Sequence, residues 1–75
     1  QFSVFPNPAN KIITIQTNKA GEKTINVKDI SGRQLQSRTF DSPGTRLNIS
    51  SLPEGVYVIE MKVSNRLYTE KLVVE

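Results

Sequence analysis

Apolar and polar residues alternate along most of the chain with the two-residue period of a β-strand. Gly, Pro, Asn and Ser interrupt the alternation at short intervals, as expected of turns. The pattern predicts no helix and seven strands, at residues 2–5, 11–17, 23–30, 33–40, 45–49, 55–63 and 66–74. Seven short strands are typical of an immunoglobulin-like antiparallel β-sandwich, and we expect that all-β fold for residues 1–75 as one domain.

The alternation also assigns each strand an inner and an outer face. Thr24, Asn26 and Lys28 are expected to face water. The predicted core consists of the apolar residues on the opposite faces: Ile13, Ile15, Ile25, Val27, Leu47, Ile49, Tyr57, Ile59, Met61 and Val63.

Only residues 64–65 separate the last two predicted strands, and two residues are enough for a hairpin loop. A two-residue loop there pairs Val63 with Arg66, Met61 with Tyr68, Ile59 with Glu70 and Tyr57 with Leu72. This register turns the Glu70 carboxylate toward the core, which costs free energy unless the carboxylate reaches water or a partner. We therefore expect either a β-bulge at residues 69–71 or a sheet edge that exposes the charge.

Composition agrees with the strand pattern. Val, Ile and Thr number twenty, whereas Ala and Leu number seven. Four glycines recur every eleven or twelve residues, as turns do in a sandwich. The segment Leu52-Pro53-Glu54-Gly55-Val56-Tyr57 fits a tyrosine corner, in which the phenol donates a hydrogen bond to upstream backbone.

The residues that commonly build active centres are scarce. The chain has no His and no Cys, which excludes thiolate nucleophiles, an ordinary neutral-pH proton shuttle and a typical zinc site. The acidic residues fall in turns, on outer faces or at the end, apart from Glu70. Asn48-Ile49-Ser50 is a formal but weak glycosylation acceptor. We expect no catalytic residue, no metal site and no cofactor.

Charge does not point to a nucleic-acid or membrane partner. Ten Lys and Arg residues give a net charge of +3, but they are spread over the whole chain. Nucleic-acid binding favours a clustered basic stripe with aromatic platforms. No apolar stretch approaches the roughly 20 residues that cross a bilayer. Because the sequence begins with Gln1, we expect it to be part of a longer protein.

One surface feature remains for binding. In the predicted final hairpin, Val56, Val58 and Val73 point away from the core with Lys71 between them. Either another element covers this apolar stripe, or it is a docking surface, including one for strand addition at a sheet edge.

Four segments, in this order, resemble the type A C-terminal sorting domain of the type IX secretion system of Bacteroidetes. They are Val4-Phe5-Pro6-Asn7-Pro8-Ala9, Val27-Lys28-Asp29-Ile30-Ser31-Gly32-Arg33, Leu52-Pro53-Glu54-Gly55-Val56-Tyr57-Val58 and Lys71-Leu72-Val73-Val74. The resemblance covers essentially the whole chain.

The resemblance implies a secretion signal at the end of a cargo protein, without enzymatic activity of its own. The implied partners are the outer-membrane translocon, its shuttle proteins and a sortase-like protease that removes the signal while the cargo is anchored to lipopolysaccharide. The protein would pass through the periplasm and then reach the cell surface or the medium.

From these patterns we expect two sets of site residues. The machinery would recognise the last hairpin through Val56, Val58, Lys71, Leu72, Val73 and Val74. The structural motif would comprise Pro6, Asn7, Pro8, Gly32, Leu52, Gly55 and Tyr57.

The alternative interpretation is an accessory β-sandwich of an extracellular enzyme, which binds carbohydrate or spaces domains. Sugar binding favours an exposed planar aromatic platform. The chain has no Trp, and Phe2, Phe5, Phe40 and Tyr68 are the only candidates once Tyr57 is assigned to the core.

Overall fold

The computed structural model describes residues 2–75 and contains seven strands and no helix in that range. The strands are β1 (Phe2–Phe5), β2 (Ile12–Thr17), β3 (Lys23–Asp29), β4 (Gln34–Phe40), β5 (Gly44–Asn48), β6 (Gly55–Val63) and β7 (Arg66–Val74). Each strand lies within one residue of its predicted boundaries, because the turn residues end the alternation at the same places where the ladders end.

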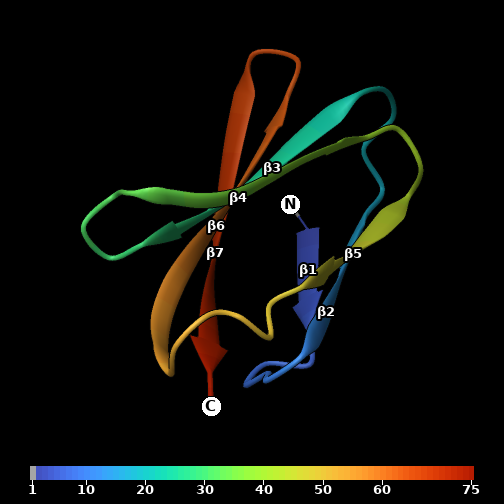
Figure 1. The fold of residues 1–75 in the computed structure, drawn as a ribbon. Coiled ribbons are helices and arrows are strands. Elements are labelled where there is room, and N and C mark those ends of the chain that lie inside the picture. Colours follow the sequence, from blue (N-terminus) through green and yellow to red (C-terminus); the bar gives the residue numbers. More distant parts are fainter. Residues whose placement is uncertain (1) are drawn as a thin grey trace.

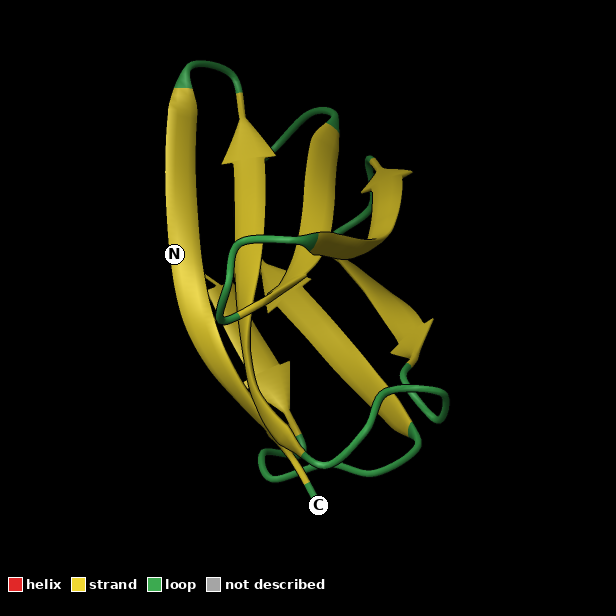
Figure 2. Ribbon diagram, turned by 60° about the vertical axis from the view of Figure 1, so that its left-hand side comes forward, coloured by secondary structure: helices red, strands yellow, loops and turns green. Residues whose placement is uncertain are grey.

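The strands form two antiparallel sheets that face each other across the core (Figures 1 and 2). One sheet has three strands in the order β1-β2-β5, and the other has four in the order β4-β3-β6-β7. β1 and β5 are therefore the edges of the smaller sheet, and β4 and β7 are the edges of the larger one. The all-β sandwich is as predicted.

The β6–β7 register is the one predicted from the two-residue loop. Tyr57 lies opposite Leu72, and Ile59 lies opposite Glu70. The ladder runs from Gly55 to Val63 without a shift, so the bulge expected at residues 69–71 is absent and Glu70 instead reaches solvent at the sheet edge. A register shift occurs elsewhere, in the β3–β4 pair between Val27 and Lys28.

The core lies between the two sheets and includes all ten residues predicted for it. Four further apolar residues are buried with them: Phe2, Ala9, Leu72 and Val74. Phe2 comes from the first strand, and Leu72 and Val74 come from the last one, so the two ends of the chain contribute to the same core.

Two polar residues are buried, and one of them was expected to be exposed. Asn26, predicted to face water, is only 6% exposed. It lies between Ser37 and Glu60 in the ladder, on the outer face of a central strand, and the neighbouring strands cover it. That prediction is wrong because a position on the outer face of a four-stranded sheet is not necessarily exposed.

Lys23 is the second buried polar residue, at 1% exposure. Its Nζ donates hydrogen bonds to the carbonyl oxygens of Lys19 (3.1 Å) and Gly21 (2.7 Å). The same ammonium lies 5.1 Å from the centroid of the Phe40 ring. The turn before β3 thus supplies partners for a charge that would otherwise be costly to bury.

Polar side chains connect the two sheets where β4 faces β5. The side-chain amide of Gln36 donates to the Asn48 carbonyl at 2.9 Å, and the Arg38 guanidinium donates to the Thr45 hydroxyl at 3.4 Å. Gly44 begins β5 so close to β2 that a Cβ atom there would lie 2.8 Å from the Ile15 carbonyl oxygen. A side chain at this position would therefore push the two strands apart.

Candidate recognition surface on the last hairpin

The tyrosine corner fixes the start of the last hairpin. The Tyr57 hydroxyl donates a hydrogen bond to the Pro53 carbonyl at 2.5 Å, while its ring is buried. Leu52 packs against the core on the same loop, and Gly55 begins β6 two residues before the tyrosine. This geometry is the one expected from the sequence motif.

The outer face of this hairpin carries the apolar stripe. Val56 is 45% exposed and lies directly opposite the half-buried Val73. The next outward pair is Val58, which is half-buried, opposite the exposed Lys71. The smaller sheet packs on the other face of these strands, so the stripe lies on the side of the hairpin that faces away from the core.

Leu72 and Val74 do not belong to this face. Their exposed fractions are 0% and 4%, and both side chains pack in the core. Successive side chains of a strand point to opposite faces, so Leu72 and Val74 cannot share a surface with Lys71 and Val73. The expectation that they form part of a surface contact is corrected: their side chains hold β7 in place.

The segment Pro6–Ala9 closes part of the outer edge of β7. The Asn7 amide donates to the Lys71 carbonyl at 2.9 Å, and its Oδ1 accepts from the Val73 N–H at 3.0 Å. Ala9 continues the contact, since its N–H donates to the Val73 carbonyl (2.9 Å) and its carbonyl accepts from the Glu75 N–H (2.8 Å). Asn7 thus takes the place that a neighbouring strand would occupy.

This contact was not found from the sequence. The prolines indicated only that the first strand ends there. The hydrogen bonds of Asn7 link residues 64 and 66 positions apart, a separation at which no local pattern indicates a partner. It also restricts the predicted strand addition, because the edge of β7 is already occupied from Lys71 onward.

Gly32 lies in the β3–β4 turn with a φ of 92°, a conformation that glycine adopts without strain. Asp29 organises this turn through its Oδ1, which accepts from the Ser31 hydroxyl (2.6 Å), the Ser31 N–H (3.0 Å) and the Arg33 N–H (2.9 Å). These hydrogen bonds, that of the Ser31 hydroxyl foremost, lower the pKa of the Asp29 carboxyl below its ordinary value. The turn is therefore a structural feature, and nothing in it resembles a binding site.

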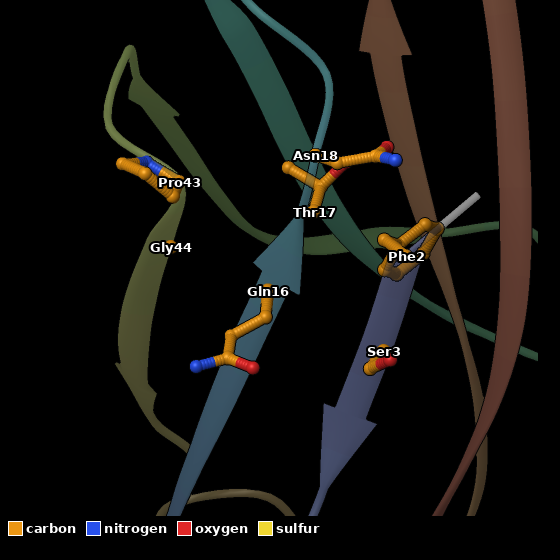
Figure 3. A pocket seen from close by; sticks show the side chains of 7 residues that line it. All are labelled: Phe2, Ser3, Gln16, Thr17, Asn18, Pro43 and Gly44. Carbon is orange, nitrogen blue, oxygen red and sulfur yellow. The ribbon is translucent and has the colours of Figure 1, made fainter.

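Other parts of the surface offer little chemistry. Residues 2–75 contain no group of three or more acidic residues that could hold a metal ion. An open hollow of about 600 Å³ lies at one end of the smaller sheet, lined by residues of β1 and β2 and by Pro43 and Gly44. Its polar side chains do not converge, since the amides of Gln16 and Asn18 point in different directions (Figure 3).

The aromatic side chains do not form a platform for a sugar ring. Phe2 and Tyr57 are buried, and Phe40 lies under the Lys23 ammonium. Tyr68 is half-buried with the Lys19 ammonium 5.2 Å from its centroid, which leaves Phe5, at 42% exposure, as an isolated ring. The described part of the chain thus lacks the feature on which the carbohydrate-binding alternative depends. It also contains no helix of the length and apolarity needed to cross a membrane.

Comparisons with known proteins agree with the resemblance read from the sequence. Among curated proteins, no sequence matches the chain significantly. Six chains of solved structures do match it. One of them, at 23% identity and a TM-score of 0.71, comes from a study of PorZ, described as an essential bacterial surface component of the type IX secretion system of Porphyromonas gingivalis.

The match to the PorZ structure covers 99% of this chain but only 11% of that chain, and at this identity it shows the fold alone. The family evidence comes from the sequence instead. The family model described as the secretion system C-terminal sorting domain matches residues 3–75, which is nearly the whole chain. The chain therefore belongs to the secretion system C-terminal sorting domain family and is a sorting signal of type IX secretion.

Proposed function

We propose that the machinery reads this sorting signal as a folded domain, through the outer face of the β6–β7 hairpin. The contact residues are Val56, Val58, Lys71 and Val73. The observation that supports the proposal is the register of the hairpin, which places three valines and one lysine next to one another on the face that points away from the core. Apolar groups with one charge beside them suit a surface that a partner protein desolvates.

The hairpin is also held rigidly at this end. The tyrosine corner fixes β6, and Asn7 and Ala9 fix β7. A surface that is already ordered loses little conformational entropy on binding, so its few apolar contacts are enough for specific recognition.

An export assay on a reporter fused to this domain tests the proposal. Val73→Asp and Lys71→Glu each change the stripe without removing a core side chain or a backbone hydrogen bond. We expect both variants to fold, as judged by an unchanged melting curve, and to reduce export about tenfold or more, as expected when a central apolar contact or a desolvated charge is lost.

The matched controls lie at the start of β2, in the smaller sheet. Ile12→Asp and Lys11→Glu introduce the same charges at exposed positions outside the apolar stripe. Export should be normal in both controls. If both hairpin variants are exported as well as the parent, the recognition surface lies elsewhere.

We further propose the route that the family resemblance implies. The cargo precedes the signal, passes through the periplasm and meets the outer-membrane translocon and its shuttle proteins. A sortase-like protease then removes the signal and the cargo is anchored to lipopolysaccharide. Mass spectrometry of the exported reporter would test this route, because retention of residues 1–75 on the exported protein would contradict removal.

Finally, we propose that the sandwich is an immunoglobulin-like one in which the fourth strand has changed sheets. In the constant-type immunoglobulin domain the fourth strand pairs with the fifth. Here β4 pairs with β3 instead, while the pairs β1-β2, β2-β5, β3-β6 and β6-β7 match the corresponding immunoglobulin pairs. An experimental structure in which β4 pairs with β5 would contradict this assignment.

A further inference from the structure

The outer edge of β7 is free between Arg66 and Glu70. The N–H and C=O of Val73 point away from β6, because they bond to Asn7 and Ala9. In an antiparallel ladder every second residue points its backbone groups the same way, so those of Thr69 and Leu67 also point outward. Within residues 2–75, β7 pairs with no strand other than β6, and these outward groups have no partner.

The side chains along the free edge carry opposite charges at its two ends. Arg66 and Glu70 share the inner face, and both are exposed. They are about 14 Å apart along the strand, at roughly 3.4 Å per residue, so they cannot pair with each other. Neither forms an ion pair with another of residues 2–75.

A second copy of this chain can supply hydrogen-bond partners for the outward backbone groups and opposite charges for Arg66 and Glu70. We propose that two copies associate through β7 edge to edge, about a two-fold axis at Tyr68. Arg66 of each copy then faces Glu70 of the other, which forms two reciprocal ion pairs. Leu67 and Thr69 exchange backbone hydrogen bonds with Thr69 and Leu67 of the second copy, and the two four-stranded sheets become one continuous sheet.

The structure favours this register over those with the axis nearer to Lys71. An axis at Glu70 would place two carboxylates opposite each other, which is destabilising. An axis at Thr69 would need the Lys71 carbonyl, which Asn7 already occupies. With the axis at Tyr68 the second copy's Asn65 lies opposite Lys71, so its hairpin turns back toward its own β6 beside the Asn7 contact.

The axis also brings two aromatic rings together. Tyr68 would face Tyr68 of the second copy in a non-hydrogen-bonded pair, the closer of the two antiparallel pair types. Aromatic cross-strand pairs of this kind stabilise sheets. The free edge is only five residues long, so the interface is small and association should depend on concentration.

Sedimentation equilibrium of the domain fused to a monomeric reporter tests the proposal. The parent fusion should dimerise with rising concentration. Arg66→Glu or Glu70→Arg alone turns both ion pairs into like-charge pairs, and each should raise the dissociation constant about tenfold or more. The double variant R66E/E70R restores both pairs in reverse and should return the dissociation constant to near the parent value.

Two further variants test whether dimerisation depends on the β7 edge itself or only on the net charge of the domain. Arg46→Glu makes the same charge change as Arg66→Glu on β5 of the smaller sheet and should leave the dimer intact. Thr69→Pro removes an outward N–H without removing a β6–β7 hydrogen bond, and should abolish the dimer while a melting curve shows that the fold persists.

A parent fusion that stays monomeric at every concentration would overturn the proposal. So would single variants that dissociate the dimer without rescue in the double variant, because the contact would then not be reciprocal. Either result leaves the recognition proposal untouched, since the export assay tests the outer face of the hairpin and this experiment tests its edge.

Discussion

The two halves of β7 differ in how their backbone is satisfied. From Lys71 to Val74 the strand bonds to β6 on one side and to Asn7 and Ala9 on the other. From Arg66 to Glu70 it bonds to β6 alone. Buried side chains follow the same division, since Leu72 and Val74 are buried and the first half contains no buried residue.

The difference shows two ways of managing an exposed sheet edge. The second half is covered by another segment of the chain. The first half keeps its free backbone groups but carries charged side chains, among them Glu70 on the inner face, which discourage pairing with an arbitrary strand. The charged half therefore permits only a partner with complementary charges, whereas the covered half permits none.

The largest effect on stability is expected when a core side chain is removed from the covered half of β7. Leu72→Ala should lower the free energy of unfolding by about 2 to 5 kcal/mol, because it leaves a cavity among fully buried neighbours. Thr69→Ala, the matched truncation in the free half, should change it by less than about 0.5 kcal/mol. Urea denaturation measures both, and equal effects would mean that the two halves are equally well packed.

A smaller effect on stability is expected when the hydrogen bonds from Asn7 to β7 are removed. Asn7→Ala removes two hydrogen bonds to β7 and should cost about 1 to 3 kcal/mol, at roughly 0.5 to 1.5 kcal/mol each. Asn7→Asp keeps the acceptor for the Val73 N–H and loses the donor to Lys71, so it should lie between the parent and Asn7→Ala.

Amide hydrogen exchange localises that effect. In Asn7→Ala the Val73 N–H should exchange faster, while the Met61 N–H in the central strand β6 should change only as far as global stability does. If the Val73 amide exchanges at the parent rate, Asn7 does not hold the edge.

The smallest effect concerns the β3–β4 turn, which lies toward the opposite edge of the sheet and serves as a reference for both halves. The pKa of Asp29 is lowered in the folded protein, so its contribution to stability is present above the unfolded value and is lost as pH falls through the folded pKa. Ser31→Ala removes the main cause and should raise the pKa of Asp29 toward its ordinary value of 3.8. Carboxyl NMR titration measures the shift, and an unchanged pKa would exclude the hydroxyl as its cause.

Local pattern predicted most of the fold, because alternation and turn residues act over a few positions. Ile13, Ile25 and Met61 were placed in the core by their spacing alone. The loop at residues 64–65 gave the β6–β7 register pair by pair. The tyrosine corner was equally local, since Tyr57 bonds only four residues upstream.

The remaining features depend on contacts between distant segments or on neighbouring strands. Asn7 meets β7 only in the folded chain, and Lys23 is buried because a preceding turn happens to offer two carbonyl groups. Asn26 is buried by strands on both sides. At the recognition surface, alternation correctly places Val73 on the outer face and Leu72 on the inner face. The family motif is a run of four consecutive residues, and taking the whole run as a contact surface wrongly put both on one face.

The contact between Asn7 and β7 also constrains the timing of folding. A ribosome delivers Asn7 early and its acceptor at Lys71 a further 64 residues later. Until then Asn7 and Ala9 have no strand to cover, and Phe2 and Ala9 lack the neighbours Leu72 and Val74 that complete their burial. The domain can therefore close only after translation has passed its last strand, so a nascent or truncated chain would not present the finished surface.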